Sequence, residues 1–138
     1  MEPATAEDMS SGPPRAQGHF CWWELATSDP AGAQAFYSKV LGWGCHEIDM
    51  GGRPYWLWTQ GADAMNPGGM MRHSEGMSDP AFWLMYVLVD DVDAATERVA
   101  DLGGAVMATP MDVPGQGRMS VITTPSGAAM ALFKSASN

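Results

Sequence analysis

The chain has 138 residues, which is enough for one domain with a substantial core, and a formal net charge of −9. Its seven Lys and Arg residues form no cluster that would neutralise phosphates, which argues against nucleic-acid binding. No apolar stretch approaches the roughly 20 residues that a membrane span requires. The acidic surface either attracts cationic small molecules or only keeps the protein dissolved.

The cysteines and the start of the chain predict a cytoplasmic protein. Cys21 and Cys45 are too few for a disulfide framework, and both lie in apolar, strand-like segments. We expect buried thiols in a reducing compartment. Residues 1–17 are acidic, contain Pro, Ser and Ala, and lack the apolar stretch of a signal peptide, so we expect a disordered tail.

The first half predicts a β-α-β-β-β order. Residues 18–27 are an aromatic-rich strand candidate, after which Asp29 can cap a helix and Gly42 can end it. Gly-containing turns then separate three further strand candidates, residues 43–48, 54–59 and 64–72. The apolar residues at helical spacing in the predicted helix are Ala33, Phe36, Tyr37, Val40 and Leu41.

The second half repeats this order. The apolar run 82–89 predicts a strand, Asp90 and Asp91 can cap a helix, and Gly103-Gly104 can end it. Three strand candidates follow, at residues 105–111, 118–123 and 128–134. One face of the second helix carries Val92, Ala95, Val99 and Leu102. The prediction is an α+β fold of two βαβββ units, about 18–72 and 80–134.

Several segments resemble the vicinal oxygen chelate superfamily, which includes glyoxalases, bleomycin resistance proteins and dioxygenases. They are FYSKVLGW, VDDVDAATERVADLGG, Gly69-Met70-Met71, GQGR and TPSGAAMALF. The resemblance covers residues 18–134 and is to single-module members. It implies an eight-stranded mixed sheet curled into an open cup, with helices outside and the site inside, and it implies a homodimer. Such a cup is typical of small-molecule sites.

The resemblance also implies where a metal ion would be bound. Metal-dependent members carry His or Glu at four inward positions, one on each of four strands. The flanking motifs place three of these positions at Trp22, Leu84 and Ala131 and the fourth near Trp56 or Leu57. None of these side chains ligates a divalent ion, and a slip of one residue does not supply a ligand set. We therefore expect neither metal nor other cofactor.

The three histidines leave one alternative open. His19 lies at the mouth of the first strand candidate, His46 is on the second, and His73 is in the loop between the two halves. We interpret them as edge or loop residues, with a metal site shared among them as the alternative.

Strand alternation predicts what else faces the cup. It places Glu24 on the face of Trp22 and Tyr86 on the face of Leu84. From the strand 54–59 come either Tyr55 and Leu57 or Trp56 and Trp58. These aromatic side chains either fill the cup as core or line a ligand cavity. The predicted ligand-binding residues are Trp22, Tyr55, Trp56, Trp58, Leu84, Ala131 and, at the mouth of the cup, Arg118.

Glu24 is the one carboxylate predicted inside the cup. An unpaired carboxylate in an apolar interior costs several kcal/mol, so Glu24 should have a partner or a function. Arg72, Arg118 or backbone amides are the expected structural partners. The functional alternatives are an anchor for a cationic or hydroxylated ligand, or a general acid/base assisted by a hydrogen bond from Tyr86.

Three functions follow from these observations. The first is metal-independent binding of a hydrophobic or aromatic, cationic small molecule. The second is a metal-free enzyme that acts on a hydrophobic metabolite, with Glu24 and Tyr86 as catalytic residues. The third is a divalent-metal lyase or dioxygenase of the same superfamily.

Overall fold

The computed structural model describes residues 16–60, 64–73 and 81–136. It contains two consecutive βαβββ units, as predicted. The first unit consists of β1 (Phe20–Thr27), α2 (Pro30–Leu41), β2 (Trp43–Met50), β3 (Arg53–Gln60) and β4 (Ala64–Arg72). The second consists of β5 (Phe82–Leu88), α3 (Val92–Asp101), β6 (Ala105–Val113), β7 (Gly117–Thr123) and β8 (Ala129–Ser135). The predicted tail lies outside the described residues except for residues 16 and 17.

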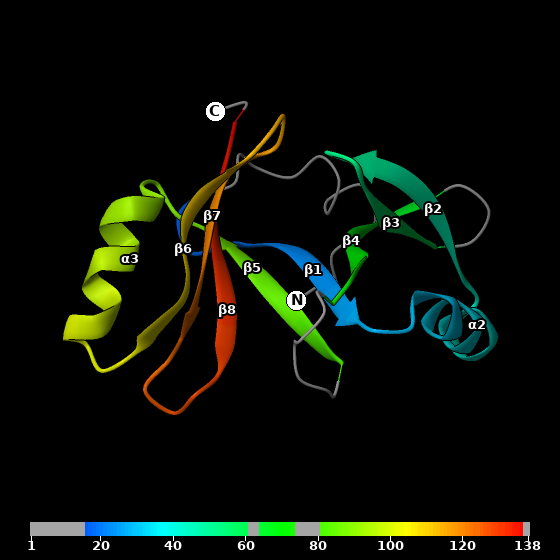
Figure 1. The fold of residues 1–138 in the computed structure, drawn as a ribbon, viewed down its shortest axis with the longest axis horizontal. Coiled ribbons are helices and arrows are strands. Elements are labelled where there is room, and N and C mark those ends of the chain that lie inside the picture. The colour runs from blue at the N-terminus through cyan, green and yellow to red at the C-terminus, as the bar shows by residue number, and fades with distance from the viewer. Residues whose placement is uncertain (1–15, 61–63, 74–80, 137–138) are drawn as a thin grey trace, which may run out of the picture.

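All eight strands form one sheet in the order β2-β3-β4-β1-β5-β8-β7-β6. β1 pairs with β4, and β5 with β8, in parallel, while β1 and β5 join the two units as an antiparallel pair. In Figure 1 the hairpins β2–β3 and β6–β7 stand on either side of these central strands, and the helices lie at the two ends. The α+β fold with a curled, mixed eight-stranded sheet is confirmed.

Each helix begins at the predicted aspartate. The Asp29 side chain accepts a hydrogen bond from Gly32 N, and the Asp91 side chain from Ala94 N, each at 3.0 Å. Gly42 follows α2 with φ of 75°, a left-handed conformation that glycine adopts without strain. Local capping chemistry therefore fixes both helix starts, and the second lies 62 positions after the first.

The apolar face of α2 is only partly covered. Ala33 and Tyr37 pack against the sheet, whereas Phe36, Val40 and Leu41 are 58%, 58% and 51% exposed. The helix lies at one end of the sheet, so only part of its surface meets strands (Figure 1). On α3, Leu102 is likewise exposed beyond the helix end. The sequence pattern thus predicted both helices but overestimated their contact with the core.

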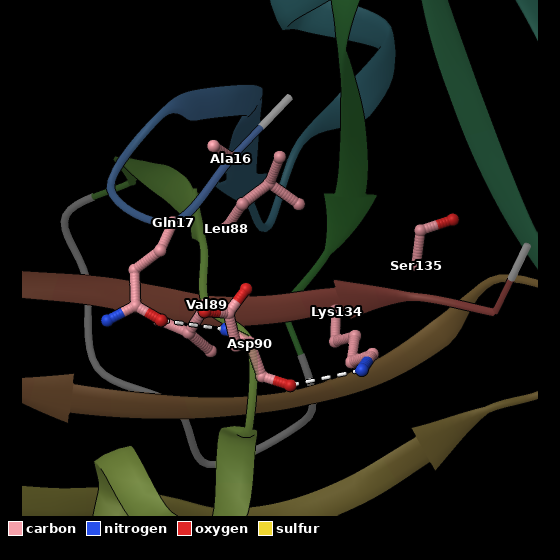
Figure 2. Close-up of a pocket in the computed structure, with 7 residues that line it drawn as sticks. All are labelled: Ala16, Gln17, Leu88, Val89, Asp90, Lys134 and Ser135. Atoms are coloured by element: carbon pink, nitrogen blue, oxygen red, sulfur yellow. Dashed lines mark hydrogen bonds between the residues drawn. The ribbon is translucent and has the colours of Figure 1, made fainter. Parts of the chain in front are cut away.

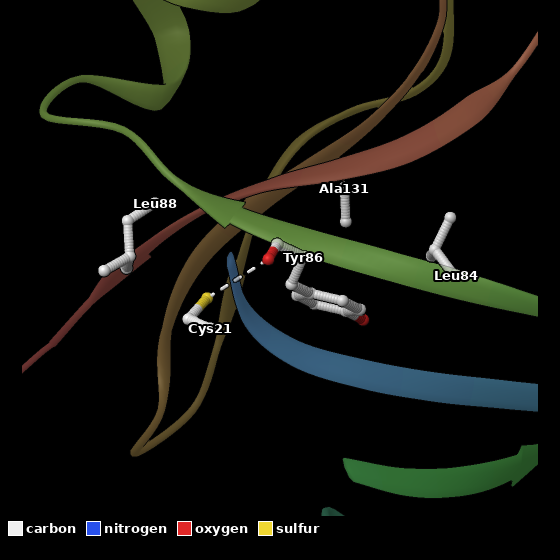
Figure 3. Close-up of a cluster of buried hydrophobic side chains, with 5 residues drawn as sticks. All are labelled: Cys21, Leu84, Tyr86, Leu88 and Ala131. Carbon is white, nitrogen blue, oxygen red and sulfur yellow. Dashed lines mark hydrogen bonds between the residues drawn. The ribbon is translucent and has the colours of Figure 1, made fainter. Parts of the chain in front are cut away.

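The two faces of the sheet carry separate apolar clusters. The cup-side cluster consists of Cys21, Leu84, Tyr86, Leu88 and Ala131, from β1, β5 and β8 (Figure 3). The outer cluster, between the sheet and α2, consists of Leu25, Trp56, Trp58 and Met70. Neither described helix is long and apolar enough to cross a membrane.

Candidate functional site

Glu24 and Tyr86 meet at the centre of the sheet. The register of β1 and β5 pairs Glu24 with Leu84 and Trp22 with Tyr86, so Glu24 and Tyr86 are diagonal neighbours on one face. The Tyr86 hydroxyl donates to Glu24 Oε2 at 3.0 Å. The predicted common face of Trp22, Glu24, Leu84 and Tyr86 is therefore present.

Tyr55 reaches Glu24 from two strands away because Gly69 lies between them. Gly69 of β4 is paired with Glu24 on one side and with Leu57 of β3 on the other. A Cβ atom on Gly69 would overlap the ring of Tyr55, so this ring crosses β4 over the glycine. The Tyr55 hydroxyl then donates to Glu24 Oε1 at 2.9 Å. Of the two alternatives for β3, the structure shows Tyr55 and Leu57 in the cup.

Two further side chains contact the tyrosine hydroxyls. Trp22 Nε1 donates to Tyr55 Oη at 2.9 Å, and Met119 Sδ of β7 lies 3.8 Å from Tyr86 Oη. We call Trp22, Glu24, Tyr55, Tyr86 and Met119 the Glu24 network. Met119 was not predicted as a site residue.

The interior of the network is shielded from water. Glu24, Tyr55 and Tyr86 are 7%, 9% and 8% exposed. Burial raises the pKa of Glu24 above its ordinary value of 4.5, and the two tyrosine hydrogen bonds offset part of this shift. Burial and the charge of Glu24 also raise the pKa of both tyrosines, so their hydroxyls stay protonated and available as donors.

The partners of Glu24 are hydroxyl groups and not the predicted arginines. Arg72 donates to the Ser28 carbonyl oxygen at 3.1 Å. In the part of the chain that the structure describes, the ion pairs are those of Arg118 with Asp93 and Asp112. The expectation that Glu24 pairs with Arg72 or Arg118 is wrong, since both guanidinium groups have partners elsewhere.

Arg118 faces α3 and not the mouth of the cup. Its Nε lies 2.7 Å from Asp93 Oδ2, and its Nη1 lies 3.0 Å from Asp112 Oδ1. Ser120 lies on the same face of β7, and its Oγ is hydrogen-bonded to Thr96 Oγ1 of α3 at 2.8 Å. The prediction that Arg118 orients a ligand at the cup mouth is wrong, because strand alternation turns it to the opposite face of β7.

Trp56 and Trp58 also lie away from Glu24. Both belong to the outer cluster beneath α2, and Trp58 is 1% exposed. Trp58 Nε1 donates to the Gly69 carbonyl oxygen at 3.0 Å, and its ring lies 5.5 Å from that of Tyr37. Their predicted place in the ligand-binding set is wrong: they are core residues on the other face.

Around the Glu24 network the cup face is apolar. Leu84 and Ala131 are buried in the cup-side cluster, as predicted for inward positions. The partly buried hydrophobic side chains packed against this cluster are Trp22, Met119, Val121 and Phe133. They form the partly exposed apolar rim of the cup-side cluster.

Two surface hollows lie apart from the network. One is where residues 16 and 17 meet β5 and β8 (Figure 2). There Gln17 Oε1 accepts from Asp90 N at 2.9 Å, which holds residue 17 against the second unit. Within the second unit, Lys134 Nζ donates to the Asp90 carbonyl oxygen at 3.1 Å. The other is shallow and follows the β2–β3 hairpin at Glu47, Ile48, Asp49, Gly52 and Pro54.

The near-symmetry of the two units locates the fourth position of a family metal site. The offset of 62 positions relates Trp22 to Leu84 and Glu24 to Tyr86. Gly69 pairs with Glu24 in the first unit, and Ala131 pairs with Tyr86 in the second. Gly69 and Ala131 are also 62 positions apart. This symmetry of pairing favours Gly69 for the fourth position over the predicted place near Trp56 or Leu57.

The residues at these four positions do not fit a divalent ion. Trp22, Leu84, Gly69 and Ala131 offer no oxygen, thiolate or imidazole ligand, and the ring of Tyr55 fills the space beside Gly69. Across residues 16–60, 64–73 and 81–136, no three His, Cys, Asp or Glu side chains come together as a metal-binding group. His19 and His46 are exposed, while His73 is buried beyond β4, where its backbone N donates to the Thr27 carbonyl oxygen.

Comparison with known proteins places the chain in one family. The model of the Glyoxalase/Bleomycin resistance protein/Dioxygenase superfamily matches residues 16–132. The chain belongs to this superfamily. It is 39% identical over 126 residues to CFP32 of Mycobacterium tuberculosis, named "Putative glyoxylase", covering 86% of this chain and 46% of that protein. It is 35% identical over 133 residues to the "Anthracycline biosynthesis protein DnrV" of Streptomyces peucetius, covering 86% and 48%.

This superfamily member thus spans about half the length of the curated relatives it matches. Among solved structures, methylmalonyl-CoA epimerase from Mycobacterium tuberculosis aligns with a TM-score of 0.59 and 18% identity, over 90% of this chain and 92% of that one. The Mn(II)-bound glyoxalase from Novosphingobium aromaticivorans aligns with a TM-score of 0.54 and 21% identity, over 86% and 39%. At these identities the alignments support the fold alone.

Proposed function

We propose that this protein binds a hydrophobic or aromatic, cationic small molecule in the cup without a metal ion, with the Glu24 network as its polar anchor. One observation carries the proposal: Glu24 is a buried carboxylate held by two neutral hydroxyl groups, and none of its hydrogen-bond partners among the described residues is a cation.

A cationic ligand would compensate for the burial of Glu24. An ionised carboxylate without a countercharge is costly in an apolar interior, and a nearby positive charge favours the ionised form. A ligand ammonium group near the network would supply that charge. The net charge of −9 would in addition attract cations to the protein.

The rest of the cup suits a flat apolar molecule. Trp22 and Phe133 offer aromatic surface, and Met119 offers a flexible, polarisable side chain. An aromatic ring also attracts a cation placed over its face. The name of the Streptomyces peucetius relative makes a polycyclic anthracycline a reasonable first probe.

Calorimetry with an anthracycline that carries a primary amine tests this function. We expect binding at micromolar affinity or better, and a loss of about tenfold or more for its neutral N-acetyl derivative. Glu24→Gln should abolish the preference for the amine, whereas Glu47→Gln, at an exposed carboxylate on β2, should retain it. Failure of cationic aromatic probes to bind, or equal affinity for amine and amide, would contradict the proposal.

The raised pKa of Glu24 favours a second candidate, metal-free acid/base catalysis on a hydrophobic metabolite. Burial raises the pKa of this carboxyl group in the direction of neutral pH, where a general acid or base is most effective. Tyr86 can in addition donate a hydrogen bond to a developing negative charge. If a substrate is found by mass spectrometry, Glu24→Gln should abolish turnover and spare affinity. Turnover that survives this substitution would rule out the catalytic role.

We further propose that two copies associate. Phe20 and Trp23 of β1 are 59% and 43% exposed, with ring centroids 5.9 Å apart, and form an apolar surface suited to such a contact. Light scattering should show a dimer that Trp23→Lys dissociates and that Leu102→Lys, at an exposed helix end, leaves intact.

A cytoplasmic location stays a proposal. Cys21 and Cys45 are thiols and not disulfide partners, which agrees with a reducing compartment.

A further inference from the structure

The hydrogen bonds around Glu24 have a direction that Trp22 imposes. An indole N–H is a donor only, so Tyr55 Oη must accept the bond from Trp22. The single proton of the Tyr55 hydroxyl is then left for Glu24 Oε1. Oε1 is therefore an acceptor and a poor place for an added proton.

Tyr86 is not fixed in this way. Its hydroxyl has two acceptors within reach, Glu24 Oε2 at 3.0 Å and Met119 Sδ at 3.8 Å. A rotation about the Cζ–Oη bond exchanges one for the other. When Tyr86 donates to the sulfur, its oxygen is free to accept a hydrogen bond from Glu24.

We propose that Trp22 and Met119 are positioning residues that direct proton uptake by Glu24 to its Oε2 atom. In the ionised state both tyrosines donate to the carboxylate. On protonation an electron pair of Oε2 forms the new O–H bond, and this O–H donates to Tyr86 Oη. The Tyr86 hydroxyl then rotates about its Cζ–Oη bond and donates to Met119 Sδ. The proton comes from solvent or from an acidic group of a bound molecule, and no tyrosine loses one.

Among the residues that the structure describes, few other groups that titrate surround Glu24. β3 and β5 contribute Tyr55 and Tyr86, while the facing positions on β4 and β8 are Gly69 and Ala131. On β1 itself, the Cys21 thiol donates to the Tyr86 carbonyl oxygen at 3.5 Å. The titration of Glu24 should therefore report on its two hydroxyl partners and on what those partners contact.

The inference concerns the site used by the proposed function, but its test needs no ligand. The pH titration of Glu24 is followed by NMR in protein labelled with ¹³C at the glutamate side-chain carboxyl carbons, and the Glu24→Gln spectrum assigns the signal. Met119→Leu removes the acceptor that Tyr86 uses in the protonated state, so the midpoint should fall by about half a pH unit. Met130→Leu, opposite Ile122 on the α3 side, should leave it unchanged.

A double-substitution cycle shows whether Met119 acts through Tyr86. In the Tyr86→Phe background, Met119→Leu should have no further effect on the midpoint. Trp22→Phe should instead raise it, because Tyr55 loses the donor that polarises its bond to the carboxylate. Trp83→Phe is the matched control, since the Trp83 indole donates to Tyr37 at 3.2 Å on the other face.

Three results would overturn the inference. The Glu24 titration midpoint would fall no more with Met119→Leu than with Met130→Leu, or it would still fall with Met119→Leu in the Tyr86→Phe background. The third result is a lower midpoint with Trp22→Phe. If Trp22→Phe does not fold, the cycle of Met119 and Tyr86 still decides. Since all readings come from the free protein, they are independent of whether an anthracycline binds.

Discussion

The ring of Tyr55 occupies the space that a side chain at Gly69 would fill. By the symmetry of the two units Gly69 is the counterpart of Ala131, where the family resemblance implies a metal ligand, and here an aromatic ring fills the space. The tyrosine hydroxyl is thereby brought to 2.9 Å from Glu24. Gly69 thus explains both why the Tyr55 ring can fill this space and why the Tyr55 hydroxyl reaches Glu24.

Gly69→Ala should destabilise the protein by about 1–3 kcal/mol, the usual cost of overpacking a filled interior. The added methyl group would displace the Tyr55 ring and break its bonds to Glu24 and Trp22. Urea denaturation measures the effect. In a Tyr55→Ala background, where the ring is absent, the same substitution should cost much less. Equal costs in both backgrounds would show that Gly69 and Tyr55 are not coupled.

Glu24→Gln should change how stability depends on pH. A raised folded-state pKa means that the folded protein binds the Glu24 proton more tightly than the unfolded chain. This contribution is complete below the unfolded-state pKa and is lost as pH rises through the folded-state pKa. The wild type should therefore lose stability relative to Glu24→Gln as pH rises above about 4.5.

The amide of the Glu24→Gln variant can also reproduce the hydrogen bonds of the protonated carboxyl group, accepting from Tyr55 and donating to Tyr86. Denaturation midpoints measured at about six pH values between pH 4 and pH 9 would test this. Glu47→Gln serves as the exposed control on β2. A constant difference between wild type and Glu24→Gln at every pH would be inconsistent with a buried, titrating Glu24.

Local chemistry made the fold predictable from sequence. Asp29 and Asp91 cap helices, and Gly42 ends one, through interactions within a few residues. The common face of Glu24 and Trp22 followed from strand alternation alone. The relation of Glu24 to Tyr86 also depends on the antiparallel register of β1 and β5, which the sequence pattern did not specify.

The sequence predictions of the site failed where the two faces of a strand have the same apolar character. Both faces of β3 are apolar, so the pattern could not choose between Tyr55 with Leu57 and Trp56 with Trp58. The role of Gly69 depends on a ring that approaches from another strand, and no local pattern signals such an approach. Its presence in the Gly69-Met70-Met71 motif was the one available hint.

Arg118→Ala should leave the cup unchanged. Its guanidinium group pairs with Asp93 and Asp112 on the α3 side and lowers the pKa of Asp93. NMR should show the Asp93 pKa rise toward its ordinary value in the variant, with the Glu24 midpoint unmoved. Since the pair is exposed, the thermal midpoint should change little. A shift of Glu24 comparable to that of Asp93 would indicate that Arg118 acts in the cup after all.

Divalent metals should not stabilise the protein. An ion that binds the folded state at 100 times its dissociation constant adds about 2.7 kcal/mol of stability, which a thermal melt detects readily. Trp22, Leu84, Gly69 and Ala131 supply no ligand atoms, so Mn²⁺, Ni²⁺ or Zn²⁺ should leave the thermal midpoint where EDTA leaves it. Elemental analysis of the purified protein should likewise show no stoichiometric divalent metal. A stoichiometric ion whose removal lowers the midpoint would overturn the metal-independent function, and loss of that ion in Glu24→Gln would identify Glu24 as its ligand.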